Sequence, residues 1–208
     1  MKRRSCRTIR LGPVAIGPDA PVSVQSMTKT DTADVDATVR QIAELAELGC
    51  DIVRVAIPNM QAAKAVARVV KQSPIPVVAD IHFDHRLALK ALEGGVHGIR
   101  VNPGNMPDKE GLKAVVGLAK KKGAAIRVGV NSGSVRGETL GGRADAVTTR
   151  QGLVRLMVRK VLDDVAVLER LKFRDIKLSA KASDVPTTLS VYRALARRTE
   201  YPLHVGLT

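Results

Sequence analysis

The chain has 208 residues, of which 45% are hydrophobic and 26% charged, and it carries a formal net charge of +14. This composition is typical of a folded globular domain and excludes a disordered chain. No apolar run reaches the length of a membrane span, and the basic segment Met1–Arg10 lacks the apolar stretch of a secretory signal. We therefore expect a cytoplasmic protein that does not contact the membrane.

The excess of positive charge predicts an anionic ligand or partner, and the residue types narrow its class. Aromatic residues make up 2% of the chain and Trp is absent, so the stacking platforms that single-stranded nucleic acids require are missing. We expect no nucleic-acid partner. The two cysteines, Cys6 and Cys50, lie far apart and match no metal-ligand spacing, so we expect free thiols and no metal site in this chain.

Short β-branched runs alternate with longer amphipathic segments, which is typical of βαβ units around a parallel sheet. A hairpin that could plug a barrel is expected first, from Thr8–Leu11 and Val14–Ile16 around Gly12-Pro13. Seven strands are then predicted, at Val22–Met27, Ile52–Ile57, Val77–Ile81, Gly98–Asn102, Ala125–Val130, Asp175–Ala180 and Leu203–Thr208. Helices are predicted at Asp34–Leu48, Met60–Gln72, Arg86–Glu93, Lys109–Lys122, Gln151–Leu171 and Asp184–Thr199.

The fold class predicted from this alternation is α/β, a TIM-type (β/α) barrel with an N-terminal β-hairpin. The barrel is expected to be incomplete, because complete eight-stranded barrels have about 250 residues and the final βα unit is missing here. We treat residues 1–208 as one substrate-binding barrel domain. The polar, Gly-rich segment Ser134–Arg150 is long for a connection in a compact domain and is expected to be a functional or mobile loop.

Polar residues occupy the inward positions of the predicted strands. In a parallel barrel, alternate side chains face the helices and the lumen. Val53 and Val55 cover the helix side of their strand and leave Arg54 on the other face. The same alternation puts further polar groups on the inward face: Asp80 with His82, Arg100 with Asn102, Arg127 with Gly129 and Asn131, Lys177 with Ser179 and Lys181, and His204 with Gly206 and Thr208.

Several of these inward residues are cations, and they predict an anion site. A lone strand arginine is more often a salt-bridged structural residue. Three arginines and up to two lysines against one carboxylate, Asp80, would cost on the order of several kcal/mol per unpaired ion. A phosphate ligand at the C-terminal ends of the strands neutralises them, because arginine grips phosphate oxygens bidentately. The candidate acid–base groups are then Asp80, His82 and His204.

The strand ends also resemble a known family. Six segments are similar, in order and spacing, to the N-terminal barrel of 4-hydroxy-3-methylbut-2-enyl diphosphate synthase, the iron–sulfur enzyme of the non-mevalonate isoprenoid pathway: Val24–Thr28, Ala79–Asp84, Gly98–Asn105, Arg127–Ser134, Lys181–Val185 and Pro202–Thr208. The resemblance implies an oxidoreductase that reductively opens 2-C-methyl-D-erythritol 2,4-cyclodiphosphate. It also implies a [4Fe–4S] cluster, flavodoxin or ferredoxin as electron donor, and a homodimer for the complete enzyme.

The resemblance implies roles for individual residues. Asp80 and His82 match the polar pair beside the substrate and are the expected catalytic residues. The expected substrate-binding residues are Arg54, Arg100, Asn102, Arg127, Asn131 and Lys181, to which we add Ser179 and His204 from the same inward faces. The family holds its cluster with three Cys and a Glu in a second domain, which Cys6 and Cys50 cannot replace. We therefore expect this chain to bind substrate without a cluster and without turnover.

Two other interpretations stay open at this point. A pterin- or phosphate-binding barrel enzyme related to dihydropteroate synthase would keep the anion site and need no cluster. A basic nucleic-acid-binding module would explain the net charge, and its affinity would fall steeply with salt because many phosphates are contacted.

Overall fold

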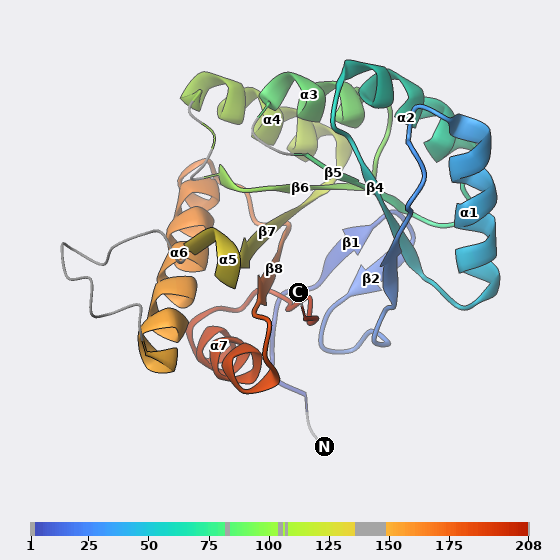
Figure 1. Cartoon of the computed structure of the whole chain (residues 1–208). Coiled ribbons are helices and arrows are strands. Elements are labelled where there is room, and N and C mark those ends of the chain that lie inside the picture. Colours follow the sequence, from blue (N-terminus) through green and yellow to red (C-terminus); the bar gives the residue numbers. More distant parts are fainter. Residues whose placement is uncertain (1–2, 82–83, 104–105, 107, 136–148, 208) are drawn as a thin grey trace.

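The computed structural model describes residues 3–81, 84–103, 106, 108–135 and 149–207. A curled, parallel six-stranded sheet forms its centre, in the order β3-β4-β5-β6-β7-β8, and an antiparallel hairpin of β1 and β2 stands beside it (Figure 1). The strands are β1 (Ile9–Leu11), β2 (Val14–Ile16), β3 (Gln25–Met27), β4 (Ile52–Ala56), β5 (Val77–Asp80), β6 (Gly98–Val101), β7 (Ala125–Asn131) and β8 (Ile176–Lys181).

Helices follow the sheet strands and cover its outer face (Figure 1). They are α1 (Val35–Glu47), α2 (Met60–Gln72), α3 (His85–Glu93), α4 (Lys109–Lys122), the short α5 (Ser132–Val135), α6 (Arg150–Arg170) and α7 (Val185–Arg198). The long helices begin where the sequence supplies a capping side chain that accepts a backbone N–H of the first turn. These N-caps are Asp34, Asn59, Asp84, Asp108, Thr149 and Asp184.

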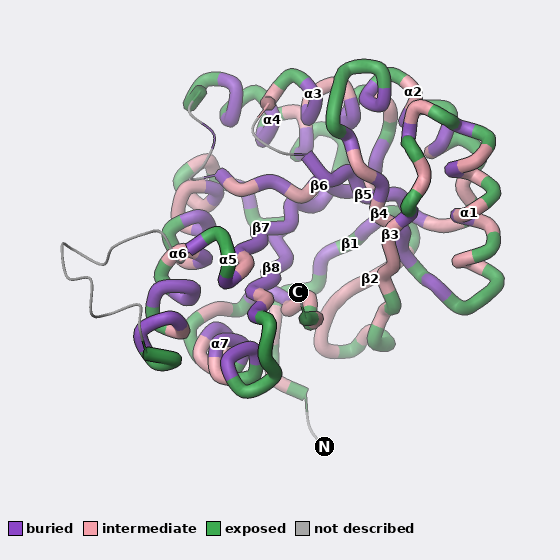
Figure 2. The backbone as a smooth tube through the Cα atoms, in the orientation of Figure 1, coloured by how far each residue is buried: buried purple, intermediate pink, exposed green. Residues whose placement is uncertain are grey.

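The main core lies between the sheet and the helices, and the strands are buried along most of their length (Figure 2). Val53 and Val55 belong to this core together with Val66 of α2, so the outward half of the predicted alternation in β4 is confirmed. Burial of each such side chain contributes roughly 1.5–3 kcal/mol to folding.

A second, smaller core closes one end of the sheet's inner face. Ile9 and Leu11 of the hairpin pack against Ile52, Val78 and Ala125, so the expected plug is confirmed. A methyl group on Gly98 would lie 2.5 Å from Leu11 Cδ2, and this close approach explains why a glycine begins β6. The hairpin therefore gives the inner face an apolar floor.

The seventh predicted strand, Leu203–Thr208, is wrong as a strand. Leu203 makes one parallel bridge with Leu178, flanked by hydrogen bonds from Leu178 N to Pro202 O (2.9 Å) and from His204 N to Leu178 O (2.7 Å). After these contacts the described segment makes no further ladder pairs. Within the described residues it has a strand neighbour, β8, on one side only. The other six predicted strands are confirmed.

Some predictions fall on residues that the structure does not describe. His82 and Thr208 are among them, and so is most of the predicted loop Ser134–Arg150, whose first two residues belong to α5. Among the described residues, no helix is both long enough and apolar enough to cross a membrane.

Candidate anion-binding site

Four charged residues on neighbouring strands lie at one level of the sheet. The register pairs Asp80 with Arg100, Arg100 with Arg127, and Arg127 with Lys177. Residues paired in a ladder point to the same face of the sheet. On each strand, the residue two positions earlier points to that face as well. Because Val78, Gly98 and Ala125 contact the hairpin floor or approach it closely, this charged row lies one layer above the floor, on the inner face.

Asp80 holds two of the arginines. Its Oδ1 lies 3.4 Å from Arg100 Nη1 and its Oδ2 lies 3.6 Å from Arg54 Nε. The Arg54 guanidinium is also directed by Met27, whose Sδ accepts from Arg54 Nη2 at 2.9 Å. The three charged side chains are largely buried, so the carboxylate orients both guanidiniums with little screening from bulk water.

Arg127 is the most deeply buried arginine of the row, with 3% of its surface exposed. Its Nε is buried and has no hydrogen-bond partner among the described residues, while Nη1 lies 3.4 Å from His204 Nε2. Burial and the positive charges of Arg54 and Arg100 lower the pKa of Arg127 to about 10, although Asp80 opposes this. A buried cation in this position is stabilised by an anion that approaches the row.

Gly129 leaves space beside two guanidiniums. A methyl group built on it would lie 2.8 Å from Ser179 Oγ, 3.6 Å from Arg100 Nε and 3.9 Å from Arg127 Nε. The missing side chain thus keeps open a small volume bordered by two cations and a hydroxyl. Ligand oxygens that accept hydrogen bonds fit the chemistry of this border.

Lys181 and Asn131 lie opposite each other where β8 and β7 end. Burial, followed by the charges of Arg127, Arg54 and Arg100, lowers the pKa of Lys181, so its ammonium shares the field of the arginines. The structure thus places Arg54, Arg100, Arg127 and Lys181 near one another on the inner face of the sheet. Their binding of an anion stays a prediction.

Two predicted site residues have structural contacts of their own. The Asn102 amide is oriented so that its nitrogen donates to Gly129 O at 2.7 Å, and it ties the end of β6 to β7. Burial and the nearby Arg127 lower the pKa of His204 to about 2. The imidazole is thus a neutral acceptor for Arg127, which argues against His204 as an acid–base group at neutral pH.

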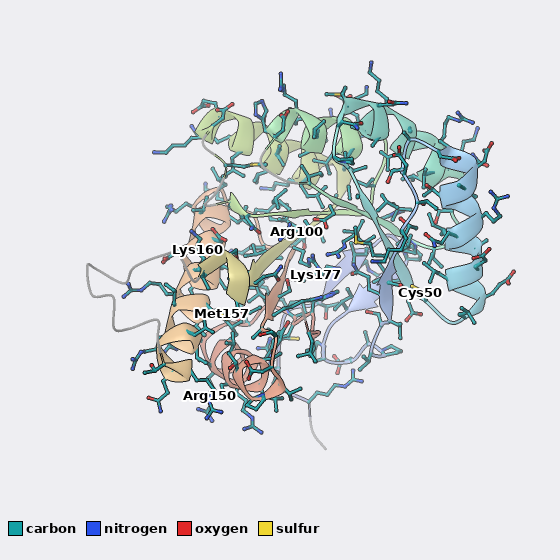
Figure 3. The ribbon with its side chains drawn as sticks, in the orientation of Figure 1. Cys50, Arg100, Arg150, Met157, Lys160 and Lys177 are labelled. Carbon is teal, nitrogen blue, oxygen red and sulfur yellow. The ribbon has the colours of Figure 1, made fainter. Side chains whose placement is uncertain are left out.

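Lys177 is a buried cation of this row that was not among the expected substrate-binding residues. Alternation puts it on the inward face, but it is the second residue of β8, away from the C-terminal strand end that is expected to bind ligand. Register shows it beside Arg127, and Figure 3 shows Lys177 and Arg100 in the interior enclosed by the strands. Only the pairing of strands, which a single sequence does not contain, reveals that position.

Comparison with known proteins identifies the family of this barrel. A family model described as the GcpE TIM-barrel domain matches residues 6–208. The chain belongs to this family. Its GcpE-type fold agrees with the predicted α/β barrel class and with the curled parallel sheet that carries the cationic row.

Curated relatives of this GcpE-family chain carry the name 4-hydroxy-3-methylbut-2-en-1-yl diphosphate synthase (flavodoxin). The protein from Geobacter sulfurreducens is 50% identical over 202 residues, which are 97% of this chain and 56% of the relative. The protein from Acidithiobacillus ferrooxidans is 46% identical over 210 residues, covering 100% of this chain and 55% of the relative. The chain thus spans just over half the length of these relatives.

Solved structures with the same fold are distant in sequence. A 7,8-dihydropteroate synthase from Vibrio fischeri ES114 aligns with a TM-score of 0.61 and 12% identity, covering 95% of this chain and 76% of its own. A 3-dehydroquinate dehydratase from Geobacillus kaustophilus HTA426 gives a TM-score of 0.64 and 13% identity, covering 96% and 78%. At such identities these similarities show the barrel fold alone.

The residues of this GcpE-family barrel do not fit an iron–sulfur cluster. Such clusters take about four ligands, mostly cysteine thiolates, and the sequence holds two cysteines. Cys50 is buried and its thiol donates to Ile52 O at 3.0 Å, and it lies far from the labelled Arg100 in Figure 3. The described residues contain no group of three or more His, Cys, Asp or Glu side chains that could hold a metal ion.

Proposed function

We propose that this GcpE-family barrel binds the diphosphate of 2-C-methyl-D-erythritol 2,4-cyclodiphosphate. It would form the substrate-binding part of the enzyme that reductively opens this ring to 4-hydroxy-3-methylbut-2-enyl diphosphate. The observation that carries the proposal is the layered row of Arg100, Arg127 and Lys177 with Arg54, against the carboxylate of Asp80. The names of relatives 46–50% identical supply the product, and the resemblance of the strand ends implies the cyclodiphosphate as the substrate.

The proposed chemistry of the chain's residues is electrostatic. Ring opening breaks a carbon–oxygen bond and leaves the oxygen on the diphosphate, so negative charge develops there. Arg54, Arg100, Arg127 and Lys181 are held in place before the ligand arrives and stabilise that charge in a site with little water. Ser179 and Asn131 are proposed to donate to phosphate oxygens, and Asp80 to keep two guanidiniums oriented and, with His82, to lie beside the reacting carbons.

The reaction also consumes two electrons and one proton and releases a hydroxyl as water. The electrons must reach the substrate from a centre that the side chains of this chain do not form. We propose flavodoxin as the donor, following the relatives' names, a cytoplasmic location, and a homodimeric complete enzyme.

A binding measurement tests the proposal. Titration of the cyclodiphosphate into the 208-residue chain by calorimetry should give one saturable site. Arg127→Met should weaken binding at least tenfold, because it removes a charge-assisted contact worth roughly 1.5–3 kcal/mol. The matched control is Arg68→Ala, an exposed arginine of α2, which should bind like the wild type. Absence of saturable binding, or equal losses in both variants, would contradict the proposal.

The two other interpretations are not favoured. The dihydropteroate synthase similarity is 12% in sequence and concerns the fold alone, so a pterin should not compete with the cyclodiphosphate. A nucleic-acid module would contact many phosphates, and the logarithm of its affinity would fall with a slope of about −0.9 per phosphate against the logarithm of salt concentration. A slope corresponding to two or fewer charges is expected here.

A further inference from the structure

Lys177 lies beside Arg127 in the charged row and has an unusual environment for a lysine. It is 3% exposed, and its ammonium donates to Gln25 Oε1 of β3 at 3.1 Å. Among the described residues it makes no ion pair with a carboxylate. Arg127 lies directly beside it in the ladder. Its hydrogen bond to Gln25 goes to a neutral amide, so this contact does not balance its charge.

The groups that surround Lys177 come from three other strands and from the segment after α7. Arg127 comes from β7 and Arg54 from β4, and both are cations; Gln25 from β3 is neutral. His204, from the segment after α7, is neutral and feels the positive charge of Lys177. Burial, followed by Arg127 and Arg54, lowers the pKa of Lys177 to about 7. Without a ligand, the ammonium is therefore poorly stabilised near neutral pH.

A cavity gives protons and water a route to this lysine. It has a volume of about 180 Å³ and lies between β3 and the Leu203 bridge, lined by Lys177, Gln25, Ser23 and His204 among others. Val22 and Val205 also line it and are 79% and 69% exposed, so it opens to solvent. Lys177 can therefore exchange a proton with water through this cavity without displacing the neighbouring arginines.

We propose that Lys177 is a further cation of the anion site and that it takes up a proton from solvent when a diphosphate binds to the neighbouring arginines. This inference rests on the proposed function and adds a residue and a proton to it. An anion close to the row stabilises the ammonium and offsets the repulsion from Arg127 and Arg54. Binding and protonation are then linked, so each favours the other.

The cyclodiphosphate suits this test because it does not titrate near neutral pH. A phosphate monoester has a second ionisation at about pH 6, whereas each phosphorus of the ring carries one acidic oxygen and no second ionisation. A lysine with a pKa of about 7 is about one-tenth protonated at pH 8 and becomes almost fully protonated if the ligand raises that pKa above 9. The expected uptake is about 0.8 proton per ligand at pH 8.

The experiment is calorimetry at pH 8 in buffers of different ionisation enthalpy, which gives the number of protons taken up per ligand bound. Lys177→Arg keeps a cation that does not titrate, so it should retain binding and lose the uptake. Lys177→Met should lose the uptake and bind at least tenfold more weakly at pH 7. Lys64→Met, a change at an exposed lysine of α2, should match the wild type in both measurements.

A direct titration keeps the proposal testable if a variant does not fold. In the wild-type chain, the ¹³Cε resonance of Lys177 should titrate near neutral pH without ligand and above pH 9 with saturating cyclodiphosphate. An unchanged titration midpoint overturns the proposal, and so does full proton uptake in both Lys177 variants, which would assign the proton to Lys181. Saturable binding without proton uptake contradicts the role of Lys177 alone, whereas no binding contradicts the proposed function and this inference with it.

Discussion

Asp80 is outnumbered by the cations around it, and this imbalance makes individual arginines testable. It contacts Arg54 and Arg100, while Arg127 lies beyond them with a buried Nε that has no hydrogen-bond partner among the described residues. Removing one guanidinium weakens the attraction for an anion and also relieves repulsion among the cations that remain. The loss of ligand binding should therefore exceed the loss of stability.

Arg100→Ala should weaken binding of the cyclodiphosphate by roughly 1.5–3 kcal/mol, the net value of a charge-assisted contact. The free energy of unfolding should fall by less, because Asp80 keeps its contact with Arg54. Calorimetric titration and urea unfolding of the same samples measure the two quantities. An unchanged dissociation constant would remove Arg100 from the site.

Gly129→Ala tests the open volume beside the guanidiniums. The new methyl group would lie 2.8 Å from Ser179 Oγ and close to Arg100 Nε, so it occupies space proposed for ligand oxygens. We expect at least a tenfold loss of affinity, with the Ser179 hydroxyl rotated away. Gly117→Ala is the control, since a methyl group there meets nothing within 4 Å. Equal affinity of the two variants would show that the ligand lies elsewhere.

Alternation along each strand was sufficient to predict which side chains face inward, because a period of two follows from strand geometry. It did not predict at which level of the sheet each of them lies relative to residues on neighbouring strands. The level shared by Asp80, Arg100, Arg127 and Lys177 is a property of strand register. For the same reason, the contact of Asn102 with Gly129 O and that of Arg54 with Met27 were not predictable from one sequence.

At the level of elements, the hairpin packs closely against the sheet because β6 begins with a glycine, Gly98. Leu11 enters the space beside Gly98, and Ile9 fills the rest of the floor with Ile52 and Val78. The cationic row stands directly above this floor, so the packing of β1 sets the lower limit of the ligand site. Damage to the floor should therefore affect both the stability and the site.

Gly98→Ala should lower the free energy of unfolding by roughly 1–3 kcal/mol, since the methyl group would approach Leu11 Cδ2 to 2.5 Å and Ala125 O to 3.0 Å. Gly117→Ala in the exposed face of α4 should instead stabilise by about 0.4–1 kcal/mol through the unfolded chain. Urea denaturation of both variants decides the matter. A stable Gly98→Ala variant would mean that the hairpin moves without cost.

Element types were predictable where capping residues and periodicity agreed, as for α1 after Asp34 and α7 after Asp184. The seventh strand was not, because its apolar pattern is compatible with a strand whether or not a neighbour is present. Leu203 pairs with Leu178 and the segment then ends its pairing. A strand on a sheet's edge depends on partners that the local sequence does not specify.

For the whole molecule, the buried basic groups make stability depend on pH. Burial and neighbouring cations lower the pKa of Lys177 from 10.5 to about 7. Burial and the charge of Arg127 lower the pKa of His204 from 6.5 to about 2. At pH values between the folded and the unfolded pKa of either group, the unfolded chain binds more protons than the folded one. The free energy of unfolding therefore rises with pH in these ranges. Urea unfolding from pH 5 to pH 9 should show this rise. Lys177→Met should flatten it between pH 7.5 and 9, and a flat wild-type profile would contradict these shifts.

The two ends of the sheet predict how the 208-residue chain behaves in solution. Among the described strands, β3 pairs with β4 alone, and the Leu203 segment bridges β8 alone. Beside these edges Val22, Val24, Val205 and Leu207 are 79%, 56%, 69% and 53% exposed. Unpaired backbone groups flanked by apolar side chains favour pairing with another chain.

We therefore expect association that increases with protein concentration, measured by sedimentation velocity. Val22→Lys should weaken it, because a charged side chain at an edge opposes strand addition. Leu48→Lys is the matched control: Leu48 is 85% exposed but lies at the C-cap of α1 and not on an edge strand, so it should associate like the wild type. A chain that stays monomeric at all concentrations, or two variants that respond equally, would show that the edges are not the contact. Weakened association with retained cyclodiphosphate binding would separate the open edges from the anion site, which lies on the inner face and needs neither edge to be paired.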